Sequence, residues 1–86
     1  MNITTLNDYL TASRDAGTLE AVEMIAEDLA DKLGKDSGSV LSILHRDRDE
    51  SNEIARRRRE LDFEVWTERL DERTREALDA LPEVVA

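Results

Sequence analysis

Apolar residues recur every three or four positions along most of the chain, which is the spacing of one face of an α-helix. The stretch 19–33 is the clearest example, with an apolar face made of Leu19, Val22, Ile25, Leu29 and Leu33. No stretch alternates apolar and polar residues for long enough to indicate a strand. The pattern therefore predicts an all-α protein with helices over about 5–16, 19–33 and 37–46, followed by a long helix or helix pair over about 50–81.

Residues that favour helix ends stand at these boundaries. Thr4 or Thr5 can cap the first helix, and Asp8 can complete a capping box with Thr5. Gly34 stands where the second helix should end, and Pro82 should stop the last one. We therefore expect residues 82–86 to form a tail.

The second half of the chain contains two further candidate breaks. The segment 46–49 reads Arg-Asp-Arg-Asp, which is too polar for a core, and it is predicted as a turn or an exposed last helical turn. Asp49 or Ser51 can cap the helix that follows. The stretch 50–81 is one helix, or two helices with a break near Asp62 and Phe63, and the pattern does not decide between them.

The segment 26–45 has the layout that a tight helix-turn-helix requires. Ala30 is small enough for two helices to approach closely, and Gly34 permits a turn with positive φ. Val40 and the pair Ile43 and Leu44 can pack back on the first helix. This segment, about 20 residues long, resembles the helix-turn-helix of phage Cro/repressor-type transcriptional regulators, and the matching residues are Leu29, Ala30, Leu33, Gly34, Val40 and Ile43.

The resemblance implies that the helix beginning near Ser37 is a recognition helix in the major groove of double-stranded DNA. The candidate DNA contacts are Lys35, Ser37, Ser39, Ser42, His45, Arg46 and Arg48. Some positions depart from a strong DNA reader. Asp36 brings a negative charge where phosphate should lie, Gly38 offers no side chain, and Leu41 is apolar on the face that should read bases.

Charge adds a constraint on any partner. The chain carries 12 basic and 21 acidic side chains, a net charge of −9 that opposes general binding to polyanions. The net charge is −4 over residues 1–35, +1 over 36–59 and −6 over 60–86. Contact with DNA should therefore be confined to residues 35–59 and depend strongly on salt. The acidic flanks favour an alternative, an all-helical protein-interaction module such as a phage-type inhibitor or DNA mimic that binds a basic protein surface.

These patterns predict one domain over 1–86, with a helix-turn-helix over 18–46 and a helical extension over 50–81 for dimerisation or another interaction. A domain of this size is marginal alone, so a homodimer is expected. Candidate interface residues are Phe63, Trp66 and Leu70, because aromatic anchors are favoured at protein contacts. The run Arg56–Arg59 is predicted as a solvated, ion-paired helix, with a clamp on the DNA backbone as the alternative.

The composition excludes several classes of function. The chain has no cysteine and a single histidine, so we expect no catalytic residue, metal site or cofactor, and no enzyme activity. No apolar run approaches the length of a membrane span. The first residues lack the basic and apolar blocks of a signal peptide, so a cytoplasmic location without membrane partners is expected.

Overall fold

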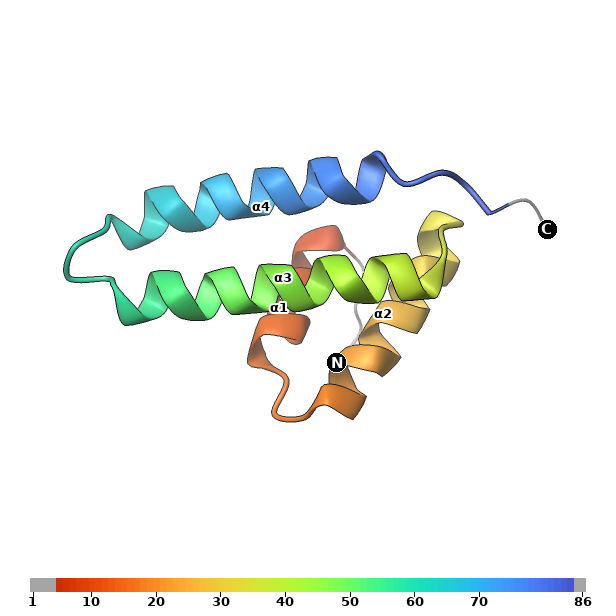
Figure 1. The fold of residues 1–86 in the computed structure, drawn as a ribbon, viewed down its shortest axis with the longest axis horizontal. Helices are drawn as coiled ribbons and strands as arrows, with labels where there is room; N and C mark the ends of the chain where they lie inside the picture. Colours follow the sequence, from red (N-terminus) through yellow and green to blue (C-terminus); the bar gives the residue numbers. More distant parts are fainter. Residues whose placement is uncertain (1–4, 85–86) are drawn as a thin grey trace.

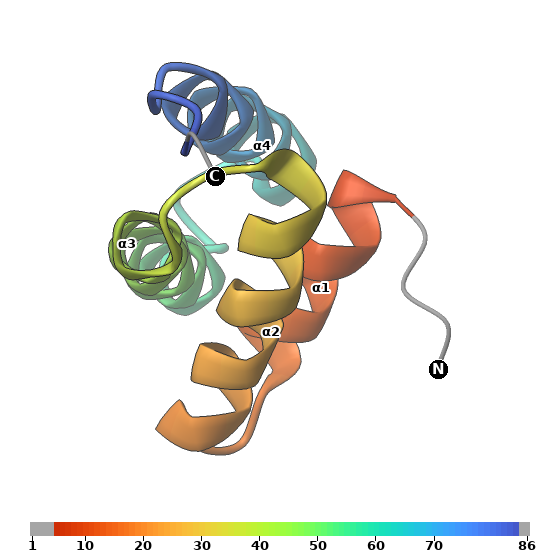
Figure 2. The same cartoon turned by 90° about the vertical axis from the view of Figure 1, so that its right-hand side faces the viewer.

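The computed structural model describes residues 5–84, which form an all-helical fold, as predicted. The helices are α1 (Leu6–Asp15), α2 (Leu19–Leu33), α3 (Ser37–Arg56) and α4 (Phe63–Asp79). Helices α3 and α4 form an antiparallel hairpin (Figure 1), and α1 and α2 lie together on one side of it (Figure 2).

Each helix begins at a side chain that accepts a backbone hydrogen bond. Thr5 accepts from the N–H of Asp8, and the Asp8 carboxylate accepts from the N–H of Thr5, both at 3.2 Å, so the predicted capping box is confirmed. Thr18, Asp36 and Asp62 cap α2, α3 and α4 through an N–H three residues later. These bonds satisfy donors that the first turn of a helix leaves unpaired. Thr4 lies outside the described residues.

A turn of three residues joins α2 to α3. It begins at Gly34, whose φ of 66° and ψ of 37° are left-handed, a conformation that glycine adopts without steric cost. Residues near the C-terminus pair with this turn. The N–H of Val84 donates to the Gly34 carbonyl at 2.7 Å, and the Lys35 ammonium donates to the Leu81 carbonyl. The described part of the predicted tail therefore contacts the α2–α3 turn.

Helix α3 is longer than predicted. The segment 46–49 lies inside it, and neither Asp49 nor Ser51 begins a helix. The chain breaks instead at residues 57–62, and α4 begins at Phe63, which is the two-helix alternative for the C-terminal half. The polarity of 46–49 is misleading because Asp47 is only 1% exposed and is paired in the interior.

The core lies where all four helices meet. It consists of Tyr9, Leu10, Val22, Ala26, Leu29, Ala30, Val40, Leu44 and Leu78. The small side chains of Ala26 and Ala30 on α2 allow a close approach to α3, whose Val40 and Leu44 are fully buried. This core occupies only one end of the hairpin. The other half of α3 and α4 projects beyond α1 and α2 (Figure 1), and the chain measures 46 × 25 × 21 Å.

A buried ion cluster ties the hairpin to α1. Arg14 donates to both carboxylate oxygens of Asp47, at 2.8 and 2.7 Å, and to Asp71 on α4 at 2.8 Å. The Thr74 hydroxyl donates to Asp47 at 2.5 Å. Burial lowers the pKa of Arg14, but its bonds to the two carboxylates outweigh that effect and raise the pKa above its ordinary value. Arg14 therefore stays charged, and the cluster joins three helices.

Candidate interaction surface

Three of the seven predicted DNA contacts take part in internal hydrogen bonds. Lys35 bonds the carbonyl of Leu81, as described above. The Ser39 hydroxyl donates at 3.0 Å to the carboxylate that caps α3. Arg48 donates to the carbonyl of Ala16, which helps to satisfy the C-terminal end of α1. These side chains have structural partners in the single chain.

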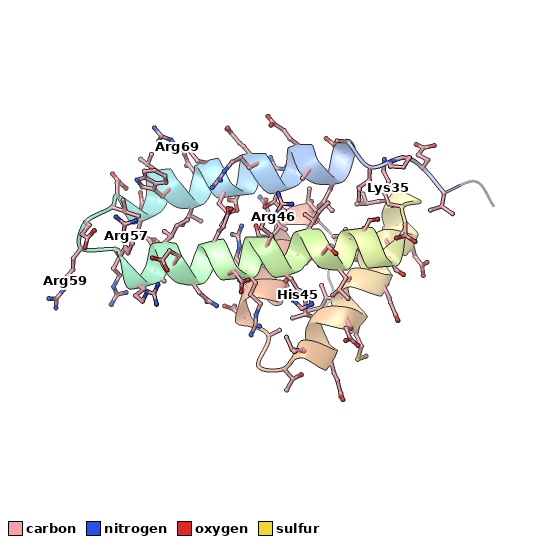
Figure 3. All side chains as sticks on the ribbon, viewed as in Figure 1. Lys35, His45, Arg46, Arg57, Arg59 and Arg69 are labelled. Atoms are coloured by element: carbon pink, nitrogen blue, oxygen red, sulfur yellow. The ribbon has the colours of Figure 1, made fainter. Side chains whose placement is uncertain are left out.

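The other four predicted contacts do not form one stripe. Ser37, Ser42 and Arg46 are exposed on α3, whereas His45 is half-buried. Figure 3 shows Arg46 on the side of α3 that faces α4 and His45 on the side toward α2. Leu41 on the expected reading face is packed in part against the core. The surface of α3 left for base reading is therefore mostly serine.

The arginine run lies far from the beginning of α3. Arg56 ends α3 and residues 57–59 belong to the turn at the tip of the hairpin, where Arg59 points away from the molecule (Figure 3). Arg56 pairs with Glu53, and Arg57 pairs with Glu60 at 3.0 Å. The 20 residues of α3 extend over about 30 Å. The basic residues of segment 36–59 are thus divided between the middle of α3 and the tip of the hairpin, and none lies in the first turns of α3.

Helix α2, which precedes the turn, presents an acidic surface. Its exposed acidic side chains are Glu20, Glu23, Glu27, Asp28 and Asp31. Such a surface beside α3 repels phosphate. At the predicted DNA contact, α3 therefore offers few basic side chains without internal partners, and the acidic α2 lies next to it.

A different surface lies on the side of the hairpin away from α1 and α2. Two adjacent cavities of about 70 and 150 Å³ open there, and every residue lining them belongs to residues 43–77 of the hairpin. The apolar part of their floor consists of Ile43, Ile54, Leu61, Trp66, Leu70 and Ala77, and the buried, paired Asp47 and Thr74 complete the floor of the smaller cavity. Charged side chains border this floor, and they are Arg46, Glu50, Glu53, Arg57, Arg69 and Arg73. We call these residues the hairpin face.

The charges of the hairpin face are organised around its floor. Arg73 on α4 pairs with Glu50 on α3 at 3.1 Å and so bridges the groove between the helices. The Arg69 guanidinium lies over the Trp66 ring, 5.3 Å from the ring centroid. The charged side chains that line the two cavities are three arginines and three acids, so they balance, although the whole chain carries −9.

The predicted interface residues have different positions. Trp66 is 36% exposed on the hairpin face, and Phe63 is 45% exposed at the beginning of α4. Leu70 is 1% exposed, so it belongs to the interior of the hairpin and forms only the bottom of the groove. The charged border of the hairpin face was not predicted from the sequence. Arg46, Glu50 and the C-cap residue Arg57 lie on one side of the hairpin only because 46–56 is a continuous helix.

A second titratable side chain with a shifted pKa, Tyr9, lies in the core, away from the hairpin face. The Tyr9 hydroxyl donates to the Asp28 carboxylate, and this bond raises the pKa of Tyr9 above 10.0. Lys32 lies 5.2 Å from the centroid of the same ring. This contact joins α1 to α2 and provides no acid or base that works near neutral pH.

Within residues 5–84, no group of three or more His, Asp or Glu side chains could hold a metal ion. No helix in this range combines the length and apolar character needed to cross a bilayer. The chain matches no protein-family model, no curated protein and no solved structure in sequence or fold comparisons. A functional proposal therefore depends on the residues and geometry described above.

Proposed function

We propose that the chain is a small helical protein-interaction module that binds its partner through the hairpin face. The observation that carries this proposal is the face itself. An apolar floor that includes the partly exposed Trp66 lies between charged borders, and both cavities over it are lined by hairpin residues alone.

The composition of the hairpin face is typical of a protein interface. Tryptophan and arginine are enriched among the residues that contribute most to protein binding, and such anchors need a rim that excludes water. Trp66 and the arginines around it supply the anchors, and the paired Glu50 and Arg73 supply part of a polar rim.

The architecture supports the same proposal. Beyond α1 and α2, the hairpin is a single layer of two helices (Figure 1), and a helical layer normally buries its apolar side against another layer. Only Ile54 and Leu70 are buried in the projecting half, at 6% and 1% exposure. A partner on the hairpin face would supply the missing layer.

Photo-crosslinking from a single site tests the proposal. A photoreactive phenylalanine analogue placed at Arg69 should form covalent protein adducts in cells that make the chain, because Arg69 borders the floor. The same analogue at Glu23, on the exposed side of α2, is the matched control and should form few. Equal adduct yields at the two positions, or none at Arg69, would contradict the proposal.

A second candidate function is DNA binding by α2, the turn and α3, and the turn geometry favours it. A turn of three residues with a left-handed glycine is typical of helix-turn-helix proteins, and the turn at Gly34 has these properties. Ser37, Ser42 and Arg46 remain exposed on α3 for contacts with DNA. The acidic surface of α2 and the internal bonds of Lys35 and Arg48 make this candidate the weaker one.

Fluorescence anisotropy with mixed duplex DNA across a salt series separates the two functions. DNA binding would weaken as salt rises and would weaken further in Arg46→Ala. Arg69→Ala removes the same charge from α4 and is the control. If the chain leaves DNA unbound even at low salt, the second candidate fails and the protein-interaction proposal is unaffected.

A further inference from the structure

We infer that the occupant of the hairpin face is a second copy of this chain, whose α3 lies antiparallel to the first α3 across a two-fold axis. This inference rests on the proposed function and names its partner. The chain would then form a dimer whose centre consists of four helices in two layers, one hairpin from each chain.

The order of charges along α3 is the first argument. Arg46, Glu50 and Glu53 on α3 and Arg57 at its C-cap follow one another at spacings of four, three and four residues, and all four line the same side of the hairpin. Their signs read positive, negative, negative, positive in either direction. Two-fold symmetry places residue i of one chain against residue j of the other, and j against i. Without a displacement, an antiparallel pair would place Arg46 against the partner's Arg57 and Glu50 against the partner's Glu53, so like charges would face one another.

A displacement of about one helical turn along the helix axis makes part of this pattern complementary. With such a displacement, Arg57 of each chain faces the partner's Glu50. The symmetry repeats the contact, so each dimer gains two opposite-charge pairs. Glu50 already contacts Arg73 and Arg57 already contacts Glu60 in the single chain, so the pairs would extend into a network across the interface. Such networks set the partner and the register of helical pairs.

The charge of the whole chain is the second argument. Two copies at −9 each repel one another over most of their surface. The charged residues that line the cavities of the hairpin face are three arginines and three acids, so two such faces meet without net charge and avoid this repulsion. Because α1 and α2 lie on the other side of the hairpin (Figure 2), joining two hairpin faces keeps both acidic α2 surfaces apart.

The size of the face is adequate for a homodimer. Residues 43–57 form about four helical turns, or about 21 Å of α3, and two helices side by side are about 20 Å wide. Projecting side chains raise the accessible area of such a footprint above its flat value. Stable interfaces of the smaller kind bury about 600 Å² or more on each partner, so a homodimer through this face lies at the small end of that range.

Charge reversal provides the experiment. Sedimentation velocity should show that the natural chain forms dimers at micromolar concentration. Arg57→Glu should weaken self-association about tenfold or more, because each new carboxylate faces the partner's Glu50, and so should Glu50→Arg, because each new guanidinium faces the partner's Arg57. An equimolar mixture of the two variants should form heterodimers, since all four opposed residues then have opposite signs across the interface.

Two variants with the same charge changes elsewhere serve as controls. Arg59→Glu at the tip matches Arg57→Glu, and Glu23→Arg on α2 matches Glu50→Arg. Both residues are exposed and lie outside the hairpin face, so both control variants should still dimerise. Circular dichroism of every variant should retain the helical signal, which confirms that lost association is not lost folding. Heterodimers that form no better than either variant alone would overturn the antiparallel pairing.

The single tryptophan reports on the same contact. Trp66 is partly exposed in the single chain, so its emission should shift to shorter wavelength as the natural chain is concentrated and should not shift for Arg57→Glu. A chain that stays monomeric at every concentration overturns this inference. In that case, crosslinks from position 69 to a different protein would leave the proposed function intact, and no crosslinks at all would remove both.

Discussion

At the scale of single residues, the structure depends on one acidic side chain in the interior. Asp47 is 1% exposed and accepts hydrogen bonds from Arg14 and Thr74. A buried charge is tolerated only where partners compensate its lost hydration. Removing Asp47 leaves the Arg14 guanidinium with Asp71 as its remaining ion partner and the buried Thr74 hydroxyl without its acceptor, and this penalty is larger than the net contribution of the intact cluster.

We expect Asp47→Ala to lower the free energy of unfolding by about 3 to 5 kcal/mol. Asp47→Asn keeps the shape and one acceptor, so it should cost less. Urea denaturation followed by circular dichroism measures both. Asp49 is exposed on the same helix, so Asp49→Ala should change the free energy of unfolding by no more than about 0.5 kcal/mol. A similar loss for Asp49→Ala and Asp47→Ala would contradict the role of the ion cluster.

The chain's single tyrosine predicts a specific loss of stability at high pH. The bond to Asp28 raises the pKa of Tyr9 in the folded state above 10.0. Ionisation therefore favours the unfolded chain, so this contribution is fully present below about pH 10 and is lost as pH rises through the folded-state pKa. Tyr9→Phe keeps the ring near Lys32 but has no hydroxyl, so the stability difference between the two proteins should shrink above pH 10 in thermal melts.

At the scale of the helices, the sequence predicts the beginnings and ends that local chemistry controls. The capping box at Thr5 and the glycine end of α2 at Gly34 are both as expected. The extent of α3 was not predictable from the sequence. Arg14 and Asp47 are 33 residues apart, so no local pattern indicates that a charged residue in 46–49 is buried. The charged border of the hairpin face was missed for the same reason.

A comparison of two glycines tests the turn between α2 and α3. Gly34 has a φ of 66°, whereas Gly17 does not have a positive φ, and a Cβ at either position meets nothing within 4 Å. Gly34→Ala should therefore cost about 1 kcal/mol or somewhat more through backbone strain alone. Gly17→Ala should range from neutral to about 1 kcal/mol stabilising. Equal effects of the two substitutions on the urea midpoint would argue against the left-handed turn.

At the scale of the whole molecule, net charge is the dominant feature. Of the 21 acidic side chains, those on α2 lie close together on an exposed helix face, and their repulsion opposes the compact state. The internal pair of Arg14 and Asp47 is screened by salt much less than these surface charges, because Asp47 is buried. Salt should therefore remove more repulsion than attraction.

We expect the melting temperature at neutral pH to rise as sodium chloride is added from low concentration to physiological ionic strength and above. The double variant Glu23→Gln/Glu27→Gln carries two fewer negative charges and should show a smaller rise. Differential scanning calorimetry measures both. A melting temperature that falls with salt in the natural chain would indicate that surface ion pairs outweigh repulsion.

The contact between the α2–α3 turn and the residues after α4 has a consequence for the order of folding. Lys35 and Leu81 are 46 residues apart, whereas α3 and α4 are joined by a short turn. Closing a long loop costs more chain entropy than closing a short one, so the hairpin should form first and the closure at Lys35 last. Stopped-flow refolding of Lys35→Ala should then give an unchanged folding rate and faster unfolding. The contacts of Leu81 and Val84 with the α2–α3 turn should therefore form late in folding and slow the unfolding of the native chain.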